Sequence, residues 1–325
     1  MNTLISALAA VVRFVAFGLA LGAALIVIAA QGGRFSDRLD VLTHFTPIWL
    51  CLGAAALVIW VIGGGRRLAS PTPILGGVAI LGAALLMAPE LGRPEPGPPP
   101  TEGETIKVVQ FNLWGRAGRP DGMLEWILAQ DADILVLEEA FARSGGVTKA
   151  LRKQYPYQTT CADPRPCSTV ILSRLEPIRE TGLQRQPVML SGALATYRTA
   201  RGPFTVIGVH YTWPIPAGPQ QQMTRRLAEV VDTLPSGSTI VAGDFNSTPW
   251  SFSLRRQDRR LGLERRTKAL ASWPAAAFTR YRIASPFPLL PIDHLYAGAD
   301  WKTVSVKRGP ALGSDHYPVV VTLRR

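Results

Sequence analysis

The sequence predicts an α+β protein: a four-layer α/β/β/α sandwich of two facing mixed sheets, preceded by three transmembrane helices. Three observations predict it. Long apolar stretches fill the first ninety residues, a proline-rich stretch follows, and the rest of the chain holds many short strand patterns and few helical ones. Only 18% of the 325 residues are charged, whereas a soluble domain usually carries about 25%. Part of the chain is therefore expected to lie outside water.

The three apolar stretches predict a three-helix membrane anchor over residues 1–90. Leu4–Ala30 holds one charged residue, Arg13, while residues 48–62 and 74–88 hold none. A membrane-spanning helix needs about 20 mainly apolar residues; the first stretch has them, and the other two reach that length with their flanks. The alternative is a cleaved signal peptide followed by two buried helices. It is disfavoured because the first stretch is too long for a signal core and lacks a clear basic start.

The short loops between these stretches indicate an orientation. Residues 31–47, which include His44, and residues 63–73 carry two arginines each, so the positive-inside rule gives a tie. The second loop is shorter, so its charge lies closer to the helix ends and favours the cytoplasm. The C-terminal part then lies on the extracytoplasmic side of the cytoplasmic (inner) membrane. Cys161 and Cys167 flank a turn-like stretch in which a disulfide is feasible, and disulfides persist in oxidising compartments; two unrelated free thiols are the alternative.

The charge of the chain belongs to its second part. Residues 91–103 hold five prolines and three glycines and predict an extended linker. Residues 1–103 carry six basic and five acidic residues, which leaves 29 basic and 18 acidic residues, a net charge of +11, for residues 104–325. Such a charge favours anionic partners and does not choose between nucleic acid and acidic lipid headgroups.

Residues 104–325 predict the sandwich itself. Alternating or continuous apolar runs predict strands, and 3.6-residue periodicity predicts helices. Strands are expected at residues 105–112, 133–137, 169–172, 192–197, 204–210, 239–242, 292–297, 301–307 and 317–323, and helices at residues 123–130 and 220–234. So many short strands with so few helices indicate two facing sheets with the helices outside.

Polar side chains recur where these strands end. They are Asn112, Glu139, His210, Asp244, Asn246, Asp293, Asp315 and His316. Strand ends at one edge of a sandwich can converge, and folding alone gives no reason to place carboxylates there. Because burying unpaired charges is costly, a bound cation is the usual remedy. The sequence therefore predicts a metal-dependent site at one sheet edge.

Six segments in chain order resemble the endonuclease/exonuclease/phosphatase superfamily. They are QFNLW (110–114), DILVLEE (133–139), VHYTWP (209–214), VAGDFNSTPWS (241–251), PIDHLYA (291–297) and GSDHYPVVV (313–321). The resemblance covers residues 105–325 and implies a Mg²⁺-dependent hydrolase of phosphate esters, with Mn²⁺ able to substitute. Together with the three preceding helices, the chain is similar to membrane-anchored bacterial members such as VanJ-type proteins. Those members imply a substrate such as undecaprenyl pyrophosphate outside the membrane.

The resemblance also implies which residues hold the metal. Glu139 is the expected ligand, with its neighbour Glu138 as the alternative. Asn112 would contribute through its side-chain oxygen, although a turn-capping asparagine is the ordinary alternative. Asp315 would complete the shell. Mg²⁺ prefers such oxygen ligands and keeps several waters.

The remaining residues receive catalytic roles from the same resemblance. Asp244 would orient or deprotonate the attacking water, and Asn246 would hold a phosphate oxygen; in an extended chain the two would face the same side, and an Asx turn is the alternative. His316 and Asp293 resemble the family's His–Asp dyad, whose charge stabilises the transition state. His210 resembles a second catalytic histidine, and a satisfied strand-end histidine is the alternative.

The substrate stays open between three hypotheses. The favoured one is a lipid-linked or membrane-proximal phosphate, for which the basic run 254–268 would meet headgroups and Trp213, Trp250 and Trp273 would lie at an interface. A solvated helix face and core packing are the ordinary alternatives for these features. The second hypothesis is an extracytoplasmic nuclease acting on DNA. The third is an inactive membrane-tethered binding protein. His294 is expected to be structural. No obligate protein partner is expected.

Overall fold

The computed structural model describes most of the chain. The described residues are 2–116, 122–141, 144–161, 168–185, 188–275 and 287–325. They form two compact units, each of which is described below by itself. The first unit joins residues 1–93 to a short distant segment, residues 248–255, and the second unit holds the rest.

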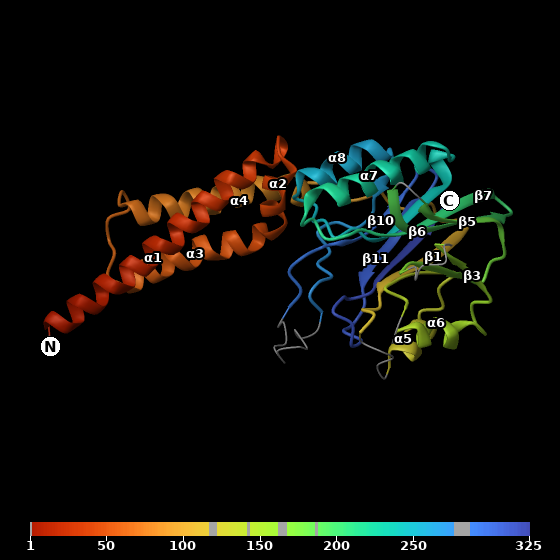
Figure 1. The fold of residues 1–325 in the computed structure, drawn as a ribbon, viewed down its shortest axis with the longest axis horizontal. Helices are drawn as coiled ribbons and strands as arrows, with labels where there is room; N and C mark the ends of the chain where they lie inside the picture. Colours follow the sequence, from red (N-terminus) through yellow and green to blue (C-terminus); the bar gives the residue numbers. More distant parts are fainter. Residues whose placement is uncertain (1, 117–121, 142–143, 162–167, 186–187, 276–286) are drawn as a thin grey trace. The chain divides into compact units, whose positions relative to one another are not determined.

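Three long helices make up most of the first unit. They are α1 (Asn2–Gln31), α3 (Thr46–Ile62) and α4 (Pro71–Leu91), and they lie side by side (Figure 1). Each belongs to a stretch that is long and apolar enough to cross a membrane. The three apolar helices that the sequence predicts are therefore confirmed.

Small residues bring these helices close together. Ala16, Ala20 and Ala24 of α1 are buried, whereas large apolar side chains such as Phe14 face outward. A Cβ atom added at Gly53 would lie 3.0 Å from the Cβ atom of Ala79. Close backbone approach through small residues is typical of helices that associate in lipid.

The connection between α1 and α3 is folded rather than loop-like. It consists of three short helical turns: η1 (Gly32–Arg34), α2 (Asp37–Asp40) and η2 (Val41–Phe45). Asp40 is 2% exposed and His44 is 3% exposed. Two polar side chains that the sequence placed in a loop are thus buried within the first unit.

The second unit contains two six-stranded sheets. The first sheet runs in the order β11 (Lys302–Arg308), β12 (Val319–Arg324), β1 (Thr105–Asn112), β2 (Ile134–Glu138), β4 (Val170–Ser173) and β3 (Tyr157–Thr160). The second runs in the order β5 (Pro177–Arg185), β6 (Val188–Thr199), β7 (Gly202–His210), β8 (Thr239–Asp244), β10 (Asp293–Ala297) and β9 (Glu264–Arg265). The pairs β1–β2 and β7–β8 are parallel and the other pairs are antiparallel, so both sheets are mixed.

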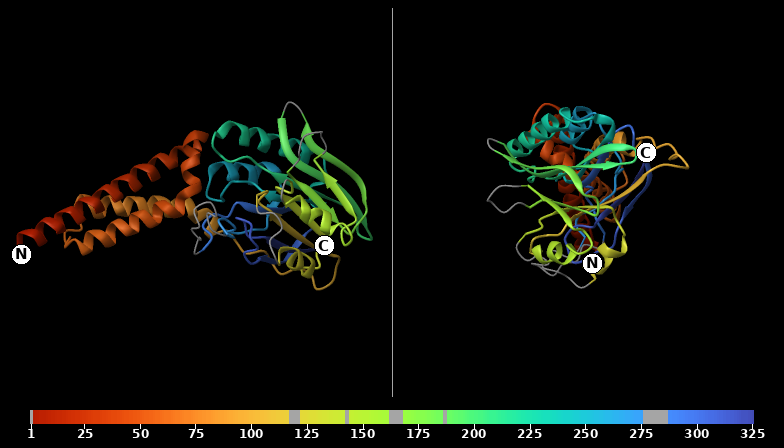
Figure 2. Two further views of the ribbon diagram at one scale, coloured as in Figure 1. Left: turned by 60° about the horizontal axis from the view of Figure 1, so that its bottom comes forward. Right: turned by 90° about the vertical axis from the view of Figure 1, so that its right-hand side faces the viewer.

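Apolar side chains fill both the space between the sheets and their outer faces. Val108 and Val136 of the first sheet share one buried cluster with Val206 and Ala242 of the second. On the outer face of the first sheet, Phe111 shares a second cluster with residues of α5 (Met123–Ala129) and α6 (Gly145–Leu151). Helix α7 (Ala217–Asp232) contacts the second sheet (Figures 1 and 2). The predicted four-layer sandwich is confirmed.

The predicted elements of this region are present, and their ends shift by a few residues. Four further elements of the second unit have no counterpart among the predicted ones: α6, β3, β5 and β9. The short turn η3 (Ser236–Ser238) was not predicted either, and helix α8 (Phe252–Leu261) covers part of the basic run 254–268, for which a solvated helix face was the stated alternative. Strand β8 extends two residues beyond its predicted end, to Asp244.

Candidate active site

Sheet order explains why the polar strand ends converge. The parallel strands β1 and β2 end together, with Asn112 opposite Glu138. The parallel strands β7 and β8 also end together, with His210 opposite Asp244. Strand β10 is antiparallel to β8 and begins at Asp293, directly opposite Asp244. Strand ends from both sheets therefore meet at one edge of the sandwich.

Amide side chains of β1 connect the two sheets at this edge. Gln110 Nε2 donates to Asp293 Oδ1 at 2.7 Å and to Glu138 Oε2 at 2.8 Å. Asn112 Nδ2 donates to Asp244 Oδ2 at 3.0 Å. Gln110 received no role in the sequence-based prediction. It lies two residues before Asn112, so the strand period places it on the same face, and that was the available signal.

Asp244 uses its two carboxylate oxygens differently. Oδ1 accepts the backbone N–H of Asn246 at 2.8 Å, which is an Asx turn. Oδ2 accepts from Asn112 and lies 3.6 Å from His316 Nε2 and 3.7 Å from His210 Nε2. Asn246 has φ +47°, so the expectation of an extended chain from 244 to 246 is wrong. The turn, not the strand, brings Asn246 to Asp244.

His316 forms a buried ion pair with Asp293. His316 Nδ1 lies 2.8 Å from Asp293 Oδ2, and the two residues are 5% and 0% exposed. Burial alone would lower the pKa of His316, but the carboxylates of Asp293 and Asp244 outweigh it and raise that pKa to about 10. Burial would likewise raise the pKa of Asp293, but His316 lowers it. The predicted dyad is thus an imidazolium–carboxylate pair at neutral pH.

His210 lies in a different electrostatic setting. Burial lowers its pKa to about 4, although Glu139 opposes this shift. Its Nδ1 lies 3.1 Å from Ser168 Oγ, which in turn lies 2.7 Å from Ser191 Oγ. Burial also raises the pKa of Asp244 to about 7. The site therefore combines a neutral histidine, His210, with the charged His316.

The candidate metal ligands Glu139 and Asp315 belong to the same edge of the sandwich as His210 and His316. Glu139 has φ +50°, a strained conformation of the kind that occurs at functional sites, and its Oε2 accepts the N–H of Gly115 at 2.9 Å. Asp315 Oδ2 accepts from Trp273 Nε1 at 3.4 Å. Burial raises the pKa of Asp315, and no described residue donates to its Oδ1. An unpartnered buried carboxylate oxygen fits a hard divalent cation.

Two details qualify the metal set. The amide nitrogen of Asn112 faces Glu139 and Asp244, while its oxygen accepts the N–H of Trp114. Asp244, Asp293 and His316 also offer ligand atoms that lie within 4.8 Å of one another. A protonated imidazole cannot ligate a metal, however, and His316 Nδ1 already bonds Asp293. In this cluster, Asp244 and Asp293 therefore hold the imidazolium of His316 rather than a metal ion.

Other expected features have different outcomes. His294 is buried between Thr267 Oγ1 and the carbonyl of Ser247, in agreement with a structural role. Trp250 is only 3% exposed, so core packing accounts for it, whereas Trp213 is 55% exposed. Cys161 is disulfide-bonded, and Cys167 lies outside the described residues.

Acidic side chains neutralise part of the basic run 254–268. Four of its basic side chains pair with acidic groups and one binds a carbonyl: Arg260 with Asp232, Arg265 with Asp258, Arg266 with Glu264 and Lys268 with Glu95, and Arg255 with Leu86 O; Arg256 also has a partner. Its capacity to bind headgroups or DNA phosphates is therefore smaller than its composition indicates.

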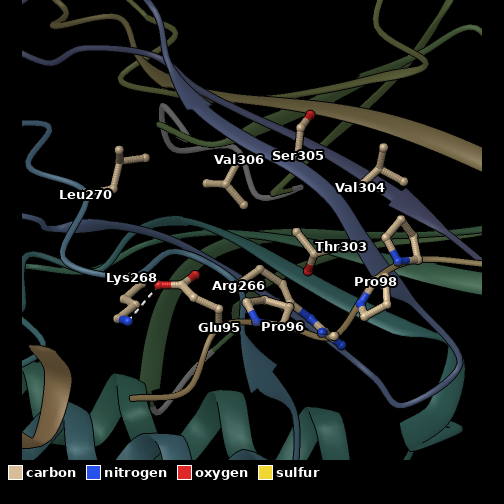
Figure 3. Close-up of a pocket in the computed structure, with 12 residues that line it drawn as sticks. Glu95, Pro96, Pro98, Arg266, Lys268, Leu270, Thr303, Val304, Ser305 and Val306 are labelled. Atoms are coloured by element: carbon tan, nitrogen blue, oxygen red, sulfur yellow. Dashed lines mark hydrogen bonds and ion pairs between the residues drawn. The ribbon is translucent and has the colours of Figure 1, made fainter. Parts of the chain in front are cut away.

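A cavity of about 440 Å³ lies elsewhere in the second unit. Residues 95–99 of the proline-rich stretch and Thr303–Val306 of β11 line it together with Arg266 and Lys268 (Figure 3). Lys268 Nζ pairs with Glu95, which also lines the cavity, at 2.7 Å (Figure 3). None of the predicted site residues lines it, so the chemistry belongs to the sheet edge.

The fold and this edge define a class of enzyme that acts on phosphate esters. A family model described as the Endonuclease/Exonuclease/phosphatase family matches residues 109–316, and the chain belongs to that family. The protein is thus a metal-dependent hydrolase of phosphate ester bonds. A search of curated proteins found no match.

Solved structures share the fold at low sequence identity. An endonuclease/exonuclease/phosphatase from Bacteroides vulgatus is 15% identical, with a TM-score of 0.54, over 68% of this chain and 99% of that one. Beta toxin from Staphylococcus aureus with bound magnesium ions is 14% identical, with a TM-score of 0.52, over 67% and 99%. Sphingomyelinase C from Streptomyces griseocarneus is 18% identical, with a TM-score of 0.50, over 67% and 99%.

Proposed function

We propose that the protein is a membrane-tethered, Mg²⁺-dependent hydrolase of a lipid-linked phosphate such as undecaprenyl pyrophosphate. The observation that carries this proposal is an apolar rim attached to the site. Trp213 and Ile215 follow β7 and are 55% and 61% exposed. Trp213 contacts Trp273 edge-on at 6.0 Å between ring centroids, and Trp273 donates to Asp315. Exposed aromatic side chains of this kind suit a lipid interface.

Several residues would hold the ion. Glu139, Asp315 and Asn112 are the proposed ligands, and Mn²⁺ would substitute for Mg²⁺. Asn112 would have to present its oxygen while that atom also accepts the N–H of Trp114. The bound ion would supply neutralisation of charge on the phosphate.

The chain's own residues would carry the remaining chemistry. Asp244 would orient the attacking water and accept its proton, as its raised pKa suits. The imidazolium of His316, held by Asp293, would stabilise negative charge on the phosphoryl oxygens. Neutral His210 would contact the phosphate or protonate the leaving group, and Asn246 would hold a phosphate oxygen.

The proposed tether and the proposed extracytoplasmic location both favour a lipid-linked substrate. Three apolar helices in the same chain would keep the enzyme at the bilayer, where a lipid-linked phosphate is concentrated. The bonded state of Cys161 supports an oxidising, extracytoplasmic location. The membrane and a phosphoester substrate are therefore the proposed partners.

A DNA substrate is the second candidate because the net charge of residues 104–325 is +11. The internal pairing of the basic run 254–268 weakens it. An inactive binding protein is disfavoured, since Asp244, Asp293 and His316 are assembled and buried together.

The first experiment tests the chemistry. Purified full-length protein should hydrolyse a phosphoester only with Mg²⁺ or Mn²⁺, and Asp244→Ala or His316→Ala should abolish turnover. Asp300→Ala, an exposed aspartate outside the site, is the control. Undiminished turnover in both site variants would contradict the assignment.

The second experiment tests the substrate. Undecaprenyl pyrophosphate, sphingomyelin, phosphatidylinositol phosphates and plasmid DNA would be compared in detergent. Trp213→Ala and Ile215→Ala should raise KM for the preferred lipid and leave hydrolysis of a small water-soluble phosphodiester unchanged. Ile178→Ala, at an isoleucine that is 53% exposed on β5, is the matched control. Faster cleavage of DNA than of any lipid would reverse the ranking.

A further inference from the structure

We infer that Asp40 and His44 are positioning residues for this hydrolysis, an inference that rests on the proposed function. Both lie in the folded connection between α1 and α3. They hold the segment 248–255, which belongs to the same compact unit. That segment begins two residues after Asn246, so it continues directly from the turn that carries Asp244 and Asn246.

Asp40 caps a helix that lies far away in the sequence. The first N–H groups of a helix have no acceptor within the helix. At the start of α8, Asp40 Oδ1 accepts the N–H of Phe252 at 2.8 Å and Oδ2 accepts the N–H of Ser253 at 2.7 Å. A carboxylate is well suited to this end of a helix. The next N–H group, that of Leu254, is bound locally by Ser251 Oγ at 3.1 Å.

His44 holds the residues just before this helix. Its Nδ1 accepts the N–H of Thr248 at 3.1 Å, and its carbonyl oxygen accepts from Trp250 Nε1 at 3.1 Å. Because Nδ1 is an acceptor, it carries no proton in this arrangement. Trp250 is buried as a result, which explains why this tryptophan does not serve as an interface residue.

The surrounding side chains are shaped for the segment. A Cβ atom at Gly33 would lie 2.9 Å from Phe252 Cδ2 and 2.8 Å from the Cα atom of Asp40. The guanidinium of Arg34 lies 5.7 Å from the centre of the Phe252 ring. Arg255 donates to the carbonyl of Leu86 in α4. Residues of η1, α2 and α4 thus contact the same eight-residue segment, 248–255.

The conformation of the turn at Asn246 explains why these contacts to residues 248–255 matter for catalysis. Asn246 has φ +47°, in the left-handed region that few residues other than glycine adopt. Strain of this kind persists only where the neighbouring chain is fixed. Ser247 O is held by His294 at 2.8 Å, and Thr248 N is held by His44. Asp40 and His44 therefore fix the C-terminal side of the turn that positions Asp244 and Asn246.

Full-length protein in detergent with Mg²⁺ tests this inference. Asp40→Ala and His44→Ala should each lower kcat about tenfold, with KM and the Mg²⁺ concentration for half-activity nearly unchanged. Asp40→Asn keeps one acceptor oxygen and should recover part of the loss. Arg38→Ala, an exposed residue of the same short helix, should behave as wild type.

A double-mutant cycle separates positioning from general destabilisation. Ser253→Pro removes one N–H group that Asp40 accepts, and proline is tolerated in the first turn of a helix. In the Ser253→Pro background, Asp40→Ala should cost less than it does alone, because only the bond to Phe252 is left to lose. Fully additive losses would contradict the inference. If Asp40→Ala does not fold, the kcat values of His44→Ala and Ser253→Pro test the positioning role instead.

The variants distinguish failure of the positioning role from failure of the proposed hydrolase function. Wild-type kcat in His44→Ala and Ser253→Pro would overturn the positioning role, while loss of turnover in Asp244→Ala would still support the hydrolase. Turnover that survives Asp244→Ala and His316→Ala would overturn both.

Discussion

At the scale of single residues, the site depends on the imidazolium of His316, which two carboxylates, those of Asp293 and Asp244, keep charged. His316 loses hydration on burial, and Asp293 and Asp244 more than compensate, so its pKa rises from 6.5 to about 10. A group with a raised pKa in the folded state stabilises the fold fully below its unfolded pKa. That stability is lost as the pH rises through the folded value. The charged pair should therefore stabilise the metal-free protein up to mildly alkaline pH.

The expected result is a fall in the free energy of unfolding of the chelator-treated protein between about pH 6.5 and 10. His316→Gln should lack this fall. NMR titration of the histidines should place His316 near pH 10, and Asp293→Asn should lower that pKa by about 1–3 units. Asp300→Asn, an exposed aspartate, is the matched control. An unchanged titration in Asp293→Asn would show that the pair does not set this pKa.

The sequence predicted the residues of this edge but not their connections. Strand ends and motif spacing predicted that Asp244, Asp293 and His316 lie close together, because strand ends at one edge of a sandwich converge. Gln110 was missed because both of its contacts are long-range: the one to Asp293 follows from the facing of the two sheets, and the one to Glu138 follows from the pairing of β1 with β2. The positive φ of Asn246 was missed because a turn ends the strand pattern there.

At the scale of elements, prediction succeeded for the buried strands. β1, β2, β7 and β8 are apolar because they are covered on both faces. β3 and β5 lie at sheet edges and are partly polar, so their pairing depends on a neighbour rather than on their own pattern. Helix α8 is mostly basic, and its buried face carries only two leucines, Leu254 and Leu261, with Gln257 between them, so its apolar stripe is too narrow to predict a helix.

Close approach of the two sheets gives a prediction at this scale. A Cβ atom at Gly208 of β7 would lie 2.8 Å from Val136 Cγ1 of β2. Gly208→Ala should therefore destabilise the sandwich by about 1–3 kcal/mol, and Val136→Ala in the same chain should recover part of the loss. Chemical denaturation followed by tryptophan fluorescence would measure both. Gly218→Ala, in α7 with no atom within 4 Å of the added Cβ, is the control; equal loss there would contradict the steric explanation.

At the scale of the whole chain, linear boundaries describe the organisation only in part. The division into an anchor (1–90), a linker (91–103) and a catalytic domain (104–325) stays a prediction. The structure assigns residues 248–255 to the same compact unit as the three apolar helices. No sequence pattern foretold this, since Asp40 and His44 read as loop residues and their partners lie about two hundred positions away.

The side of the membrane on which hydrolysis occurs is the last prediction. Arg66 and Arg67 lie in a short loop without acidic residues. The arginine counts of the two loops tie, and the shorter loop, whose charge lies closer to the helix ends, is the one expected in the cytoplasm. In a bacterial host, alkaline phosphatase fused after Arg325 should be active, and the same reporter inserted at residues 64–70 should be inactive. Replacing Arg66 and Arg67 by alanine should weaken this orientation, whereas replacing Arg34 and Arg38 should strengthen it. Reporter activity only within residues 64–70 would place the catalytic site inside the cell, where a cytoplasmic phosphoester becomes the substrate to seek.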